Sequence, residues 1–269
     1  ELKAFTPYLT SLTEPTNQLT RMGIAWQFMD LNGDSYVHRA RNSICMAFLS
    51  DPYATDLFFI DSDMSWNIEG FINMLFRPEP VIGGTYPVKN KWEAWTSKPE
   101  VHGTEKDAHF VGVPLGDGSN LIKAHQLAGG FLRIKRSVLE KFMEAYPTHR
   151  YGDSHPTPEL RMEQVEFFSC GVNREPEILL LREIEAEVMK NGGHVDMNPF
   201  KERFEALKVV RDFVGEDYCF SNRLRNMGVD MFIYPNVTIS HFGINAWTGN
   251  FDQTLRTMIK KPEAPVAVS

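Results

Sequence analysis

One short segment limits the possible folds of this chain more than any other. Residues 57–60 are an uninterrupted apolar run, Leu-Phe-Phe-Ile, and Asp61 and Asp63 follow it directly. Such a run predicts a short strand that is buried on both faces, as in a parallel sheet. Ligands of open α/β sheets bind at the carboxyl ends of the strands. The segment therefore predicts an α/β fold with a functional site that begins at Asp61.

Two neighbouring carboxylates at a strand end need a positive partner. Asp is rarely buried without one, and two close carboxylates repel each other. Mg²⁺ or Mn²⁺ would supply the charge, and such ions often take phosphate oxygens as further ligands. We therefore predict a metal–phosphate site at Asp61 and Asp63. The alternative is structural, because an Asp-x-Asp triplet often occurs by chance and one Asp could cap the helix expected after Asn67.

Composition argues against several classes of protein. The chain has 269 residues, of which 42% are hydrophobic, and this allows a sizeable core. A net charge of -7 without a basic block argues against binding of nucleic acid. No apolar run approaches the roughly 18 residues that a membrane span needs. The odd number of cysteines, in no metal-binding spacing, and the lack of a signal peptide predict a cytoplasmic protein.

Strands and helices alternate along most of the chain. Apolar spacing and capping residues predict strands at 2–5, 23–29, 57–60 and 231–234, and helices at 35–49, 68–76, 137–146 and 216–227. Residues 174–212 differ, since they predict a Glu-rich helical hairpin that could be an acceptor-side lid or an oligomer contact. We expect one domain over residues 1–252, with a helical insertion at about 174–212 and a tail at 253–269.

Positive and aromatic side chains are candidates for binding. Arg39 and Arg41 lie at the start of the helix expected at 35–49, where the helix dipole is already positive. A bound anion would explain them, although a solvated helix face is the commoner arrangement. Lys89 follows another predicted strand and would add a cation at a sheet end. Trp92 and Trp95 could form a platform for a sugar ring or a small satellite core.

Taken in order, these segments resemble the GT-A class of nucleotide-sugar glycosyltransferases, over about residues 20–170 and 214–245. The matching motifs are His38-Arg39-Ala40-Arg41-Asn42, Phe59-Ile60-Asp61-Ser62-Asp63, Gly83-Gly84-Thr85-Tyr86-Pro87, Ala128-Gly129-Gly130-Phe131, Gly215-Glu216-Asp217-Tyr218 and Ile239-Ser240-His241-Phe242-Gly243. Each motif is weak alone, but their order and spacing are fairly specific. The resemblance implies a GT-A type fold, a Rossmann-like mixed and mostly parallel sheet flanked by helices.

The resemblance implies roles for residues on the donor side. Asp61 would contact the ribose or the metal, and Asp63 would hold Mn²⁺ or Mg²⁺ against the diphosphate. His241 would complete the metal shell. Asp30 or Asn32 would recognise the base of the nucleotide. Together with the cations Arg39, Arg41 and Lys89, these residues form the predicted nucleotide site.

On the acceptor side, the resemblance implies that Asp217 is the general base of an inverting reaction, with Glu216 as the neighbouring alternative. Gly129 and Gly130 would border the acceptor or sugar, as would the two tryptophans. The predicted activity is a metal-dependent glycosyltransferase of the hexosyltransferase type. It would move a sugar from a nucleoside-diphosphate sugar to a hydroxyl of a glycan or glycoconjugate.

Two departures from the GT-A pattern leave the donor and the acceptor open. A clear first strand is missing, and residues 5–8 are at most its remnant. The helical segment at 174–212 lies outside the core pattern. Two other functions are alternatives: a haloacid-dehalogenase-like phosphatase with Asp61 as nucleophile, and a non-catalytic sugar- or nucleotide-binding module. The binding module would keep Trp92 and Trp95 but would not need Asp217.

Overall fold

The computed structural model describes residues 2–31, 34–89, 91–103, 109–115, 120–152, 162–172, 175–207, 213–243 and 245–259. Its helices are α1 (Leu2–Arg21), α2 (Val37–Ser50), α3 (Ile68–Leu75), α4 (Arg136–Ala145), α5 (Glu175–Lys190), α6 (Asn198–Ala206), α7 (Glu216–Asn226) and α8 (Phe251–Ile259). Its strands are β1 (Asp56–Ile60), β2 (Met64–Trp66), β3 (Val81–Gly83), β4 (Pro87–Val88), β5 (Lys91–Trp95), β6 (Lys98–Pro99), β7 (Val101–His102), β8 (His109–Phe110), β9 (Gly112–Pro114), β10 (Asn120–Gln126), β11 (Phe131–Lys135), β12 (Arg150–Gly152), β13 (Glu163–Val165), β14 (Gly171–Val172), β15 (Phe213–Val214), β16 (Met231–Ile233), β17 (Thr238–Phe242) and β18 (Ala246–Asn250).

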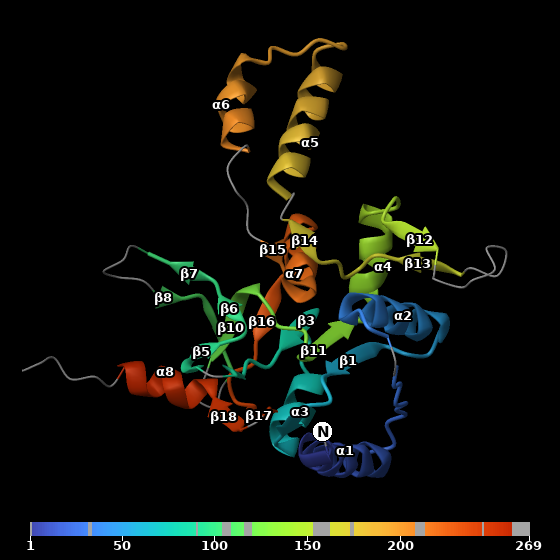
Figure 1. Ribbon diagram of the computed structural model, residues 1–269, viewed down its shortest axis with the longest axis vertical. Helices are drawn as coiled ribbons and strands as arrows, with labels where there is room; N and C mark the ends of the chain where they lie inside the picture. Colours follow the sequence, from blue (N-terminus) through green and yellow to red (C-terminus); the bar gives the residue numbers. More distant parts are fainter. Residues whose placement is uncertain are drawn as a thin grey trace, which may run out of the picture.

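The main sheet has the strand order β1-β11-β3-β16-β10-β6, and β9 also pairs with β10. In this sheet, β11 pairs antiparallel with β1 on one side and with β3 on the other. A smaller sheet with the order β18-β17-β2 lies beside it (Figure 1). The fold is therefore mixed α/β, with a central mixed sheet.

The expected mostly parallel sheet is wrong for the part of the chain that the structure describes. There, β3 and β16 are the parallel pair of the main sheet, and its other pairs are antiparallel. The apolar run at 57–60 was compatible with both arrangements, because helices can cover both faces of an antiparallel strand too. The strand itself is confirmed as β1.

Two hydrophobic clusters cover the two faces of the main sheet. Leu57 and Phe59 of β1 belong to the first, together with residues of α2, α4 and α7. Phe58 and Ile60 pack against the second, which contains residues of α1 and α3. Successive side chains of a strand point to opposite faces, so one strand contributes to both clusters. This layered packing holds the carboxyl end of β1 in a fixed position.

The N-terminal part of the chain differs from the prediction. Residues 2–5 were expected as a strand, but they belong to α1, which continues through the Thr- and Pro-rich residues to Arg21. Tyr8, Pro15 and Leu19 are buried, and their spacing places them on one helical face. Residues 23–29 were expected as a strand and form no regular element. The helices expected at 35–49, 68–76, 137–146 and 216–227 are confirmed as α2, α3, α4 and α7.

The Glu-rich segment forms the helices α5 and α6, which extend away from the sheets (Figure 1). Gly192 and Gly193 end α5 with φ values of 63° and 97°, a conformation that glycine adopts at little cost. β14 and β15 pair antiparallel at the base of the hairpin. Within the described ranges, we find no helix with the length and apolar character that a bilayer crossing requires.

Candidate functional site

Ends of several strands meet at one edge of the main sheet. Ile60, the last residue of β1, pairs with Phe131, the first residue of β11. The Asp61 N–H donates to the Gly130 carbonyl at 2.9 Å, and the Gly84 N–H donates to the Phe131 carbonyl at 2.9 Å. The segment after β1, the turn before β11 and the end of β3 are thereby side by side. Three segments of the predicted site come together because of this pairing.

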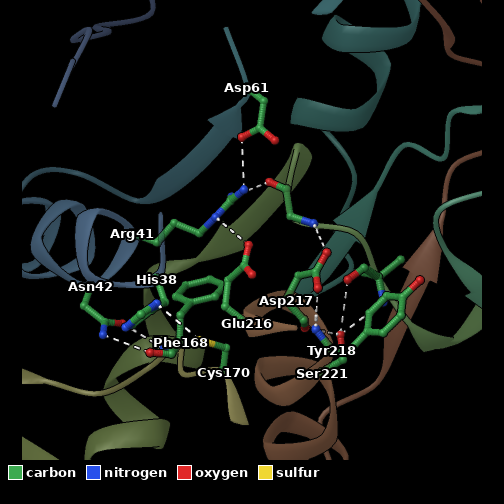
Figure 2. A network of polar contacts seen from close by, with 12 residues as sticks. His38, Arg41, Asn42, Asp61, Phe168, Cys170, Glu216, Asp217, Tyr218 and Ser221 are labelled. Atoms are coloured by element: carbon green, nitrogen blue, oxygen red, sulfur yellow. Dashed lines mark hydrogen bonds and ion pairs between the residues drawn. The ribbon is translucent and has the colours of Figure 1, made fainter. Parts of the chain in front are cut away.

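Arg41 connects the segments at this edge (Figure 2). Its Nη2 atom lies 3.0 Å from Asp61 Oδ1, and its Nη1 atom donates to the Gly129 carbonyl at 2.6 Å. Its Nε atom lies 3.7 Å from Glu216 Oε1. The Arg41 side chain is 7% exposed, and the Phe59 ring centroid lies 5.3 Å from its Cζ. The Arg41 guanidinium group is therefore bound to carboxylates and a carbonyl of the protein itself. Little of its surface is exposed to an arriving ligand.

The two carboxylates at the start of α7 have different surroundings. Asp217 accepts hydrogen bonds from the Gly129 N–H at 3.2 Å and from the Tyr218 N–H at 2.8 Å. Burial, with repulsion from Glu216, raises the pKa of Asp217 above its ordinary value despite these bonds. Glu216 faces Arg41 instead. Asp217 thus combines a fixed position with a raised proton affinity, which suits a group that accepts a proton.

The turn before β11 has no room for a side chain. A Cβ atom at Gly130 would lie 2.3 Å from Tyr86 Oη and 2.8 Å from Asp61 Oδ2. Burial, followed by the nearby charge of Asp61, raises the pKa of Tyr86. Sequence reasoning gave Tyr86 no role of its own. The sequence feature that indicates tight packing near Tyr86 is the pair Gly83-Gly84, which predicts close approach of the backbone at this point.

Asp63 lies next to two positive or potentially positive side chains. Lys89 Nζ is 2.5 Å from Asp63 Oδ2, and His241 Nε2 is 3.7 Å from the same oxygen. His241 reaches this position because β17 pairs with β2, so that His241 lies opposite Met64. Burial alone would raise the pKa of Asp63, but the contacts with His241 and Lys89 outweigh it and lower the pKa to about 2. Asp63 is therefore ionised at neutral pH.

Few of the described side chains at this edge are available as ligands for a metal ion. Over the described ranges, no group of three or more His, Cys, Asp or Glu side chains is arranged to hold an ion. Asp63 Oδ2 and His241 Nε2 lie 3.7 Å apart, whereas Asp61 pairs with Arg41. Mg²⁺ commonly binds one or two carboxylates and takes its other ligands from phosphates and water. Asp63 and His241 would contribute ligands to an ion that arrives with a diphosphate, and the described residues form no site that protein side chains alone complete.

Other predicted site residues lie farther from this edge or have other partners. Arg39 pairs with Asp34 at 2.8 Å. Trp95 packs against Phe251, with the ring centroids 5.0 Å apart. Asp30 and Asp61 both raise the pKa of Tyr8, after burial as the largest cause, to about 12. Asp30 thus acts electrostatically on Tyr8. Asn32 and the side chain of Trp92 lie outside the described residues.

No family model matches the chain, and no curated protein matches it either. Among solved structures, the chain is similar to the one entitled "Crystal Structure of A197 from STIV". The sequence identity is 15% and the TM-score 0.41, with coverage of 85% of this chain and 78% of that chain. A TM-score this low carries no argument about fold or function. The function is therefore inferred from the residues at the sheet edge.

Proposed function

We propose that the protein is a metal-dependent glycosyltransferase, in which a sugar passes from a nucleoside-diphosphate sugar to a hydroxyl of a carbohydrate or glycoconjugate. One observation carries the proposal: Arg41 lies between Asp61, of the pair Asp61 and Asp63, and Glu216, of the pair Glu216 and Asp217, at one edge of the main sheet. Asp63 of the first pair faces a lysine and a histidine, and Asp217 of the second pair has a raised pKa. The surroundings of Asp63 suit a departing anion, and Asp217 suits an attacking hydroxyl.

On the donor side, the leaving nucleoside diphosphate gains negative charge in the transition state. Positive groups fixed near that charge lower the barrier. Lys89, whose ammonium group lies 2.5 Å from Asp63, would donate to the phosphate oxygens. Asp63 and His241 would hold Mn²⁺ or Mg²⁺, and such an ion supplies Lewis acidity and orientation of the diphosphate when bound.

On the acceptor side, Asp217 would take the proton from the attacking hydroxyl, with inversion of the anomeric centre. Its two backbone hydrogen bonds hold the carboxylate in one orientation, and fixed orientation is a large part of the advantage of an enzymatic base. Because the pKa of Asp217 is raised, a fall in pH protonates this group earlier than an ordinary Asp. We expect turnover to decline as the pH falls through that pKa.

The proposal is tested by measuring how much nucleoside diphosphate the protein releases from a panel of nucleotide sugars. The assay is run with and without Mn²⁺, in the presence of mixed sugar acceptors. We expect Mn²⁺-dependent release that Asp63→Asn abolishes. Asp230→Asn is the matched control, because Asp230 is an exposed partner of Lys123. Release of inorganic phosphate from phosphomonoesters would support the phosphatase instead. Binding of nucleotide sugars without turnover would support the binding module.

The same assay assigns the base. Asp217→Asn should lower turnover by at least about 10²-fold, as is typical of the loss of a general base, while donor binding is retained. Glu216→Gln should affect turnover less. If the two effects are exchanged, the two carboxylates have exchanged roles. If neither variant loses turnover, the inverting mechanism with a base on α7 is excluded.

A further inference from the structure

We infer that Lys89 is a built-in counter-ion of Asp63 that competes with the divalent ion, so that the ion binds firmly only together with a diphosphate. The inference rests on the proposed function, because it concerns the metal and phosphate of the same site. It adds an order of binding and assigns that order to one side chain. The contacts of Asp63 and the packing of Lys89 carry it.

The competition follows from the position of the ammonium group. Lys89 Nζ lies 2.5 Å from Asp63 Oδ2, and His241 Nε2 lies 3.7 Å from the same oxygen. Mg²⁺ binds carboxylate oxygens at about 2.0–2.1 Å. An ion between Asp63 and His241 would therefore lie within a few ångströms of the lysine charge. Two positive charges at such a distance repel each other strongly in a partly buried site.

Lys89 is placed for this contact by the structure around it. A Cβ atom at Gly243 would lie 3.4 Å from Lys89 Cδ and 3.3 Å from the Trp247 ring, so the aliphatic stem of Lys89 runs close to the turn after β17. The Lys89 side chain is 35% exposed. The aliphatic stem of Lys89 is packed against this turn, whereas the ammonium group is partly exposed to solvent. Lys89 can therefore leave Asp63 by a rotation of its outer bonds.

The acceptors that are available to the Lys89 ammonium group depend on whether the ion arrives alone or with a diphosphate. An ion alone displaces the ammonium group and gives it no new acceptor. A diphosphate bound to the ion brings oxygens within reach of Lys89, and a lysine is a strong donor to phosphate. Each positive group then has a negative partner, and no charge contact is lost. This exchange makes Mn²⁺ binding depend on the diphosphate.

The test uses two probes, Mn²⁺ alone and the preformed complex of Mn²⁺ with pyrophosphate. Binding of Mn²⁺ alone is measured by the paramagnetic resonance signal of the free ion, and binding of the complex by calorimetry. We expect Lys89→Met to bind Mn²⁺ alone at least about tenfold more tightly than the wild type, as removal of a competing charged hydrogen bond implies. Lys89→Met should gain nothing, or lose affinity, for the Mn²⁺–pyrophosphate complex.

Two controls separate charge from packing. Lys89→Arg keeps the charge, so its affinity for Mn²⁺ alone should stay as weak as in the wild type. Lys201→Met removes a lysine that hydrogen-bonds Asn198 on α6, and it should change neither affinity. Asp63→Asn should abolish binding of both probes. Equal Mn²⁺ affinity in the wild type and Lys89→Met would overturn the inference.

The outcome also distinguishes this inference from the proposed function. If no variant binds Mn²⁺ with or without pyrophosphate, both the inference and the metal dependence of the proposed reaction are overturned. If Mn²⁺ binding follows the expected pattern while nucleotide sugars are not turned over, the inference stands and the transferase activity is excluded. If nucleotide sugars are turned over and Lys89→Met leaves Mn²⁺ binding unchanged, the transferase stands and the inference fails.

Discussion

At the scale of single residues, the absence of a side chain at Gly130 is itself part of the site. A Cβ atom there would lie 2.3 Å from Tyr86 Oη, 2.4 Å from Met64 Cε and 2.8 Å from Asp61 Oδ2. Because two of these neighbours are buried in the core, they cannot all move away. We expect Gly130→Ala to lower the free energy of unfolding by about 1–3 kcal/mol, as overpacking does, measured by urea unfolding.

Two variants check the cause of that loss. Gly171→Ala is the matched control, since a Cβ atom at Gly171 meets nothing within 4 Å. Tyr86→Phe removes the nearest oxygen, so Gly130→Ala should cost less in that background than in the wild type. Equal costs in both backgrounds would show that Tyr86 does not limit the space at Gly130.

The sequence predicted the charged residues of the site better than their partners. Asp61 and Asp63 were expected to share a metal ion, because two carboxylates need a counter-charge. The structure pairs Asp61 with Arg41 and Asp63 with Lys89. The sequence separates Lys89 from Asp63 by β2, α3, β3 and β4. Such pairings depend on tertiary packing, and residue spacing along the chain does not encode them.

At the scale of elements, local signals predicted helices well and strand pairing poorly. The ends of α2, α3, α4 and α7 follow from apolar spacing and from residues such as Gly228, whose φ is 67°. Pairing direction is set by partners that lie far apart in the sequence. α1 was missed because its Thr and Pro content favours a loop. The apolar face of α1, which packs on the core, outweighs this intrinsic preference.

The docking of α1 can be tested on two leucines of that helix. Leu19 is 5% exposed and belongs to the cluster beneath the main sheet, whereas Leu9 is 43% exposed. We expect Leu19→Ala to lower the free energy of unfolding by about 2–5 kcal/mol, the usual cost of a buried leucine. Leu9→Ala should change it by less than about 0.5 kcal/mol. Similar costs for both, by urea unfolding, would contradict the packing of α1 by this face.

At the scale of the whole molecule, the site is assembled from distant parts of the chain. Arg41 comes from α2, Asp61 from the end of β1, and Asp217 from the start of α7. The resemblance implied that they would meet. The pairing of β1 with β11 brings Asp61 beside the turn at Gly129 and Gly130, and Arg41 and Asp217 each hydrogen-bond to Gly129. The sequence did not predict the direction of that pairing. It also left open the role of the helical hairpin, which projects from the sheets (Figure 1).

The hairpin of α5 and α6 offers a test of how far fold and function can be separated. At its base, Val172 of β14 lies opposite Phe213 of β15 in antiparallel register. This is the geometry that a two-residue turn closes, and Asn-Gly is the preferred sequence for it. We therefore expect a variant in which Asn-Gly replaces residues 173–212 to fold around the same sheets. Shortening a connection costs little chain entropy or even reduces that cost.

Two features of α5 set the expected loss. Arg182 Cζ lies 5.6 Å from the Tyr146 ring centroid at the end of α4, and Leu180 is 1% exposed. A cation–π contact and a buried leucine are together typically worth about 2–5 kcal/mol. The shortened protein should keep its unfolding free energy within about that amount, and it should keep its affinity for Mn²⁺–pyrophosphate, since Asp63, Lys89 and His241 lie outside the hairpin. Urea unfolding measures the unfolding free energy, and calorimetry measures the affinity.

Loss of the cooperative urea transition would show that the hairpin is part of the folding unit. Intact binding with loss of sugar transfer would assign the hairpin to the acceptor side, and unchanged transfer would leave the oligomer contact as its role.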